Sequence, residues 1–88
     1  MLIHEMSTAV RDSAGRLYRA AVYASQRPDG LWQGWLEFRA AEPGRVLRTN
    51  RETVQSSKRD MEVWATGLEP IYLEGAFERA SRAAAAIG

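Results

Sequence analysis

The sequence predicts an α+β domain, in which an N-terminal antiparallel sheet of three to four strands is followed by two C-terminal helices packed on one face. Residues 16–25 and 31–38 alternate between two faces with the period of a β-strand. Pro-Asp-Gly at 28–30 forms a hairpin loop between them, and from Ser57 onward apolar residues recur at helical spacing. At 88 residues, one domain spanning 1–88 is expected.

The first strands follow from this alternation. Residues 3–10 form a possible edge strand of mixed pattern, and Asp-Ser-Ala-Gly at 12–15 favours a turn, because Gly accepts positive φ. Residues 16–25 are a clearer strand with β-favouring Tyr and Val. It places Tyr18, Ala20, Val22 and Ala24 on one face, and Leu17, Arg19, Ala21 and Tyr23 on the other.

The tryptophan-rich run at 31–38 is the next strand. Helical spacing competes, but a glycine within a helix costs about 1 kcal/mol relative to alanine, so Gly34 favours the strand. As a strand it divides into a core face of Trp32, Gly34, Leu36 and Phe38 and a second face of Leu31, Gln33, Trp35, Glu37 and Arg39. Residues 40–44 then form a turn, and residues 45–49 or beyond return as a third strand that ends the sheet.

Two helices complete the domain. Ser57 with Asp60 resembles a capping arrangement, and the first apolar stripe is Met61, Trp64, Ala65 and Leu68. Gly67 and Pro70 predict a break, with Pro70 in the first turn of a second helix. The apolar stripe of that helix is Leu73, Ala76, Phe77, Ala80, Ala84 and Ile87. We expect Trp32, Leu36 and Phe38 to pack under Met61, Trp64 and Phe77.

Catalysis has little support in the composition. Without cysteine and with His4 as the one histidine, thiol nucleophiles, histidine-dependent triads and typical zinc sites are excluded, so no catalytic, cofactor-binding or metal-binding residue is assigned. Glu37 and Glu52 are the one remaining candidate for an acid/base pair. Solvated surface carboxylates are, however, much commoner than catalytic ones. The protein is predicted to be no enzyme and to need no cofactor. The sequence has no cysteine, no apolar run long enough to span a membrane and no signal-peptide pattern. We therefore expect a cytoplasmic protein without membrane contact.

Charge divides unevenly along the chain. Residues 1–59 hold ten basic and six acidic groups, a net of +4, whereas residues 60–88 hold two basic and five acidic groups, a net of −3. Arginine outnumbers lysine eleven to one, which suits planar hydrogen bonding and stacking, although a GC-rich genome produces the same bias.

The second sheet face is the candidate binding face, and it consists of Arg19, Tyr23, Trp35 and Arg39. Three interpretations stay open. In the first, Trp35 is covered structurally, for instance by the N-terminal segment, while Arg39 pairs across strands with Glu37 or Glu42. Alternatively the face is a protein interface, because Tyr, Trp and Arg are enriched there. Last, it binds single-stranded RNA or DNA by stacking and phosphate contacts. We expect a protein that acts by binding itself or another protein, with nucleic acid the alternative.

Two resemblances add to this interpretation. Motifs at 27–38, 47–53 and 64–76, among them Gly-Trp-Leu-Glu-Phe and Tyr-Leu-Glu-Gly-Ala, resemble a family of small uncharacterised bacterial proteins of about 90 residues, which implies a bacterial stand-alone domain. The order of strands, Asp-Gly-x-Trp and Thr-x-x-x-Thr followed by a helix is similar to HicB-like antitoxin domains of toxin–antitoxin modules. That resemblance implies a regulator that binds a partner protein, although the Pro-Asp-Leu-Pro-Gly segment of those antitoxins has no counterpart here.

Overall fold

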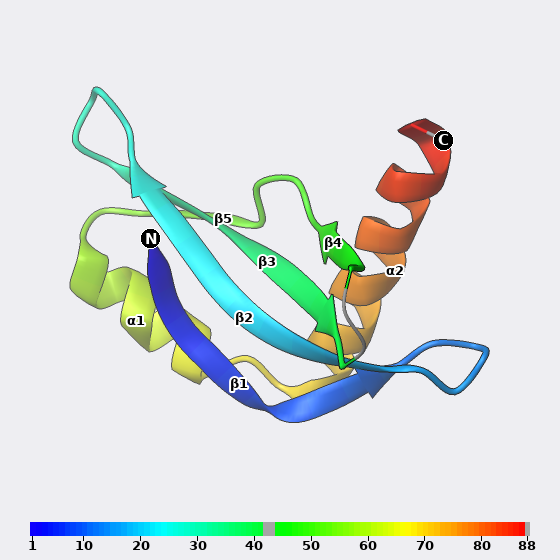
Figure 1. The fold of residues 1–88 in the computed structure, drawn as a ribbon. Helices are drawn as coiled ribbons and strands as arrows, with labels where there is room; N and C mark the ends of the chain where they lie inside the picture. The colour runs from blue at the N-terminus through cyan, green and yellow to red at the C-terminus, as the bar shows by residue number, and fades with distance from the viewer. Residues whose placement is uncertain (42–43, 88) are drawn as a thin grey trace.

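The computed structural model describes residues 1–41 and 44–87, together with the side chains of residues 1–41 and 44–85. It is an α+β fold in which a five-stranded antiparallel sheet precedes two helices on the same side of it (Figure 1). The predicted fold class is confirmed, with one strand more than expected. The elements are β1 (Leu2–Arg11), β2 (Leu17–Gln26), β3 (Trp32–Ala40), β4 (Val46–Arg48), β5 (Thr53–Gln55), α1 (Lys58–Thr66) and α2 (Pro70–Ile87).

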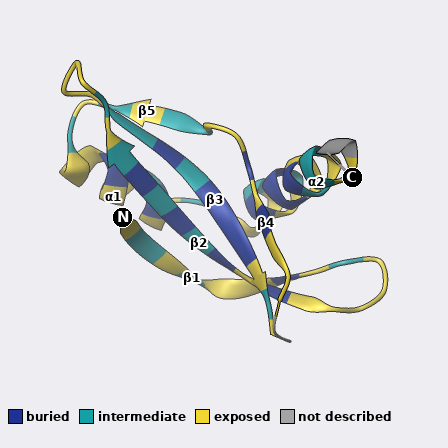
Figure 2. Cartoon of the chain, turned by 45° about the horizontal axis from the view of Figure 1, so that its top comes forward, coloured by how far each residue is buried: buried dark blue, intermediate teal, exposed yellow. Residues whose placement is uncertain are grey.

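Strands β2 and β3 form the centre of the sheet. They pair without a bulge from Tyr18 opposite Ala40 to Gln26 opposite Trp32. The burial colours alternate along β2, whereas β3 is buried continuously from Leu36 to Phe38 (Figure 2). The predicted loop closes them, because the Arg27 N–H donates to the Leu31 carbonyl and Gly30 takes a φ of 87°. This uninterrupted register determines which side chains share each face.

Strand β1 lies along the outer side of β2 and is irregular. From Leu2 to His4, β1 advances by two residues while β2 advances by one. From Glu5 to Ala9, β1 advances by four residues while β2 advances by two. The predicted turn after it is confirmed, because the Asp12 carboxylate accepts hydrogen bonds from the backbone N–H groups of Ala14 and Arg16. These bulges bend β1 away from a straight path.

Strands β4 and β5 both pair with β3, one after the other along its outer side. The expected third strand is confirmed as β4, whereas β5 was not predicted. Between them the Thr49 hydroxyl replaces a backbone carbonyl, since Thr49 Oγ1 accepts from the buried N–H of Leu36 at 3.0 Å. The Thr49 N–H donates back to the Leu36 carbonyl, and the Glu52 N–H donates to the Gly34 carbonyl. The backbone of β3 therefore keeps its hydrogen-bond partners in the gap between β4 and β5.

The core lies between the sheet and the helices. Leu36 and Phe38 are fully buried, and the Phe77 ring of α2 meets Phe38 edge-on at 5.3 Å between centroids. Tyr18 packs on the same Phe77 ring at 4.9 Å. The expectation for Trp32 was wrong in part, because it lies at the end of β3 and is only half-buried.

Gly34 allows α1 to approach the sheet closely. A Cβ at this position would lie 2.7 Å from Sδ and 3.0 Å from Cε of Met61, which is itself fully buried. Gly34 therefore has two roles in the argument for a strand. It disfavours a helix in the sequence, and in the structure its missing side chain leaves room for Met61 of α1.

The helix boundaries follow the predicted signals. Ser57 caps α1 by accepting from the Asp60 N–H at 3.0 Å, and α2 begins at Pro70. The stripe of α2 is buried from Leu73 to Ala80, and Ala84 packs against the core. Residues 42–43 of the predicted turn and the side chain of Ile87 lie outside the described residues.

Candidate functional site

The four candidate residues lie together on the face of the sheet opposite the helices, which we call the open face. Register brings them into two directly opposed pairs, with Tyr23 opposite Trp35 and Arg19 opposite Arg39. Directly opposed residues in an antiparallel pair have Cβ atoms about 4.5–5.5 Å apart, so each pair is within contact distance. Their shared face was predicted from alternation alone, whereas the opposition depends on the register.

Trp35 is half-buried between residues of the two neighbouring strands. Its ring stacks with Tyr23 of β2 at 6.5 Å between centroids and an interplanar angle of 18°. From β4 the Arg48 guanidinium lies over the ring, 5.8 Å from its centroid. The suggested cover by the N-terminal segment was wrong, because β1 is the edge strand that pairs with β2 and it does not cross Trp35. Side chains of the open face itself supply the partial cover.

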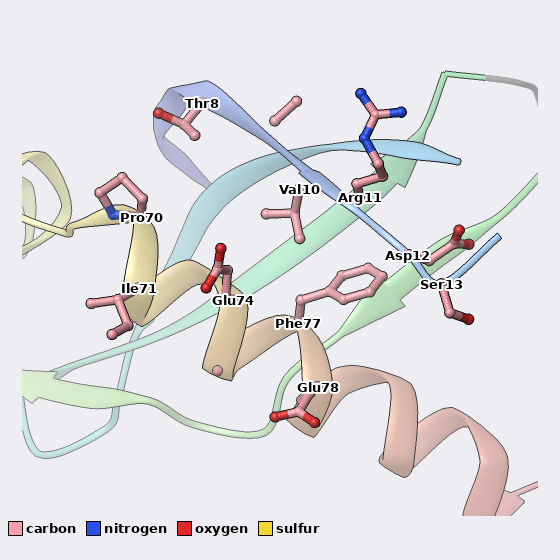
Figure 3. A pocket seen from close by; sticks show the side chains of 12 residues that line it. Thr8, Val10, Arg11, Asp12, Ser13, Pro70, Ile71, Glu74, Phe77 and Glu78 are labelled. Atoms are coloured by element: carbon pink, nitrogen blue, oxygen red, sulfur yellow. The ribbon is translucent and has the colours of Figure 1, made fainter. Parts of the chain in front are cut away.

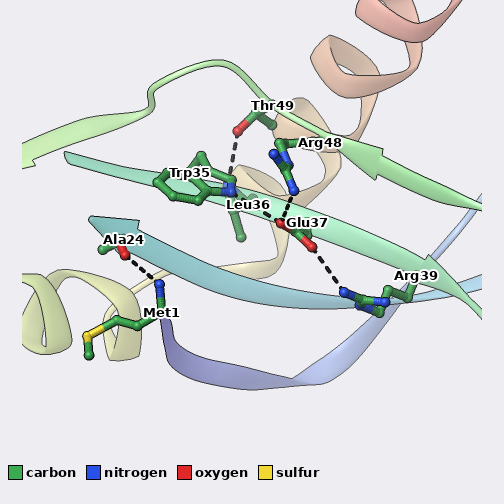
Figure 4. A network of polar contacts seen from close by, with 8 residues as sticks. All are labelled: Met1, Ala24, Trp35, Leu36, Glu37, Arg39, Arg48 and Thr49. Atoms are coloured by element: carbon green, nitrogen blue, oxygen red, sulfur yellow. Dashed lines mark hydrogen bonds and ion pairs between the residues drawn. The ribbon is translucent and has the colours of Figure 1, made fainter. Parts of the chain in front are cut away.

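Glu37 is the buried centre of the polar contacts on this face (Figure 4). One carboxylate oxygen accepts from Arg39 at 3.3 Å, and the other accepts from Arg48 at 2.7 Å and from the Trp35 indole N–H at 3.3 Å. Arg39 thus pairs with Glu37 along one strand. The Arg39–Glu37 pair was one of the predicted alternatives, whereas the burial of Glu37 and the contacts of Arg48 were not predicted. The alternation Trp-x-Glu-x-Arg indicates the pair, but Arg48 required the pairing of β4 with β3.

Exposed apolar side chains surround this polar centre on the open face. Leu17 lies in line with Arg19, Leu2 opposite Tyr23, Val46 opposite Arg39, and Val54 opposite Gln33. Each of these four aliphatic residues is between 38% and 48% exposed. The open face therefore combines a stacked aromatic pair, arginines and a ring of exposed aliphatic side chains.

Glu52, the second carboxylate considered for acid/base chemistry, lies on the helix side of the sheet. It accepts the Tyr72 hydroxyl at 2.6 Å and Arg79 Nε at 3.2 Å, both from α2. Glu37 faces the opposite side, so the two carboxylates do not meet. Burial and then the hydrogen bond to Glu52 raise the pKa of Tyr72 to about 12. This contact ties the segment before β5 to α2.

A groove of about 690 Å³ lies on the helix side, between the second half of β1 and the first half of α2 (Figure 3). Val10 and Phe77 contribute its apolar part, and Glu74 and Glu78 project along it from α2. It contains none of the four candidate residues and lies on the other side of the sheet from them.

Comparison with protein-family models, curated proteins and solved structures gives no match. The two resemblances drawn from the sequence therefore stay predictions. Within residues 1–41 and 44–87, none of the helices is long and apolar enough to cross a membrane. Over the same residues, no three side chains of the metal-ligating types form a group that would hold an ion.

Proposed function

We propose that this protein acts by binding another protein, a second copy of itself included, through the open face. The observation that carries the proposal is the position of the exposed aliphatic residues. Leu2, Leu17, Val46 and Val54 come from four different strands, and register places all of them on the face that holds Trp35. Exposed aliphatic residues that share a face with Tyr, Trp and Arg give this face the mixed apolar and aromatic composition of an interaction surface.

The centre of the face has the composition of a protein interface. Tyr, Trp and Arg are the residue types most enriched at energetically important contacts, and Tyr23, Trp35 and Arg48 lie against one another here. Trp35 is already held by Tyr23, Arg48 and the carboxylate of Glu37. A partner would therefore meet a ring whose orientation is set in advance, which lowers the entropy cost of binding.

Single-stranded nucleic acid is the alternative, supported by the arginines of the face. Base stacking needs an accessible ring face. Tyr23 of β2 and Arg48 of β4 already contact the half-buried Trp35 ring, which leaves less of it for a stacked base. Arg39 and Arg48 also share the Glu37 carboxylate, which reduces the positive charge available to phosphates. The contacts of Trp35 therefore favour a protein partner.

Two valines provide a matched test of the proposal. Val46→Glu changes the open face, where the valine is 46% exposed, and Val63→Glu changes a site on α1 that is 64% exposed. Both variants should fold, because both valines are exposed and neither belongs to the buried core. Self-association is measured by sedimentation over a range of protein concentrations. Binding to other proteins is measured by selection from a library of displayed random peptides.

We expect the wild-type protein and Val63→Glu to self-associate or to select peptides, and Val46→Glu to lose that binding. A wild-type protein that stays monomeric at high concentration and selects no peptide would contradict the proposal. Equal loss in both variants would also contradict it. Retention on single-stranded RNA that falls steeply with salt, in place of protein binding, would support the alternative.

A further inference from the structure

The open face contains a hollow of about 430 Å³ above Ala21, which we call the Ala21 hollow. Ala21 lies between Arg19 and Tyr23 along β2 and between Glu5 and Glu37 across the sheet. Three of these neighbours, Glu5, Arg19 and Tyr23, line the hollow with long or bulky side chains, whereas Ala21 contributes only a methyl group. The hollow is thus a direct result of one small residue at the centre of the face.

Two arginines stand at one end of the Ala21 hollow. Arg19 and Arg39 both line it and are directly opposite each other across β2 and β3. Like charges in this position repel each other. Arg39 reaches Glu37 at 3.3 Å, whereas Arg19 makes no ion pair with any residue that the structure describes. An anion placed between the two guanidinium groups would relieve the repulsion.

The Glu37 carboxylate does not supply that anion. It is only 4% exposed, and its other oxygen is held by Arg48 and by the Trp35 indole N–H. Glu37 therefore neutralises Arg48 as well as Arg39, and the arginine end of the hollow keeps a net positive charge. Glu5 stands on the opposite wall, from β1, so negative charge is favoured only at the arginine end.

We propose that the Ala21 hollow receives an acidic side chain of the bound protein, with its carboxylate between Arg19 and Arg39. The inference rests on the proposed function and specifies the chemistry of its partner. Planar guanidinium groups match a carboxylate in geometry and bind it through charge-assisted hydrogen bonds. The methyl group of Ala21 and the ring of Tyr23 line the remaining hollow, where they suit the methylene groups of the acidic side chain.

The test extends the peptide selection to a charge-altered variant. Arg19→Glu is combined with Arg39→Gln, since a glutamate at 39 would repel the buried Glu37. The control combines Arg59→Glu with Lys58→Gln on α1, which gives the same change of net charge on the helix side. Circular dichroism and thermal unfolding establish that both double variants are folded.

We expect peptides selected by the wild-type protein and by the control to be enriched in Asp or Glu beside apolar residues. The open-face double variant should lose that enrichment. For one selected peptide, replacing its acidic residue with the matching amide should weaken binding to the wild type about tenfold, the usual effect of losing a charged hydrogen-bond partner. The same replacement should leave binding to the open-face double variant nearly unchanged.

The outcomes separate this inference from the proposed function. Peptides that depend on Val46 but carry no excess of acidic residues would overturn the carboxylate site and leave the binding face standing. Acidic peptides that bind the open-face double variant as tightly as the wild type would do the same. Absence of any selected peptide would overturn the carboxylate site, and together with a wild-type protein that stays monomeric it would overturn the proposed function as well. Peptides that are insensitive to Val46→Glu would overturn both.

Discussion

Gly34→Ala is expected to destabilise the fold through a clash between β3 and α1. The new Cβ would lie 2.7 Å from Sδ and 3.0 Å from Cε of Met61, and 3.2 Å from Cγ2 of Thr53. Met61 is fully buried, so its end has little room to move. Overpacking of this kind costs about 1–3 kcal/mol, and replacing glycine in a strand recovers about 0.5–1 kcal/mol. The free energy of unfolding should fall by about 1 kcal/mol, and by no more than about 2.5 kcal/mol.

Chemical denaturation of a small series measures this effect. Gly34→Val should cost more than Gly34→Ala, because its branched side chain extends further into the same space. In a Met61→Ala background the loss should shrink or reverse, since only the 3.2 Å contact with Cγ2 of Thr53 remains against the strand gain. Gly67→Ala is the control, because its Cβ would lie at an ordinary 3.5 Å from the nearest atom.

A stable protein of this size has a free energy of unfolding of about 4–13 kcal/mol. Changes of the predicted magnitude therefore lie within the measurable range. An unchanged or higher stability of Gly34→Ala in the wild-type background would refute the reasoning. So would a Gly34→Ala effect of equal size with and without the Met61 side chain.

Three further predictions concern hydrogen bonds outside the candidate site. Thr49→Val should cost about 1–3 kcal/mol in urea unfolding, because it removes the acceptor of the buried Leu36 N–H, while Thr49→Ser should cost less. The pKa of Tyr72 is raised from 10.0 to about 12, so its contribution to stability is present below pH 10 and is lost as pH rises through 12. Tyr72→Phe should therefore flatten the alkaline fall in stability and remove the tyrosinate absorbance step near pH 12. Hydrogen bonds from the backbone N–H groups of Arg16 and Ala14 lower the pKa of Asp12 from its ordinary 3.8. That stability is present above pH 3.8 and is lost as pH falls below it, so Asp12→Asn should show a shallower acid transition.

The sequence carried enough information to predict the central hairpin, because long alternating runs and a Pro-Asp-Gly loop are local signals. It was not enough for β5, whose three residues are too few to show a period. The pairing of β4 and β5 with one side of β3 is made by contacts between residues far apart in the sequence. It depends on Thr49 and Glu52, whose hydrogen bonds to β3 keep the edge bonded where the strand is broken.

The candidate face was predictable in membership but not in arrangement. Alternation alone puts Arg19, Tyr23, Trp35 and Arg39 on one face. The loop between β2 and β3 then sets a register in which aromatic meets aromatic and arginine meets arginine. A shift of two residues would keep the same face and exchange these partners. The half-buried state of Trp35 depends on Arg48, which only the folded chain brings to it.

Both outer edges of this sheet are poor templates for aggregation. On one side β1 departs from regular pairing twice, and on the other β4 and β5 are three-residue strands separated by a break. Irregular or short edge strands resist the addition of another chain's backbone, which is how β-proteins avoid polymerising edge to edge. Edge-to-edge growth into fibrils is thereby disfavoured, even though the open face exposes apolar residues.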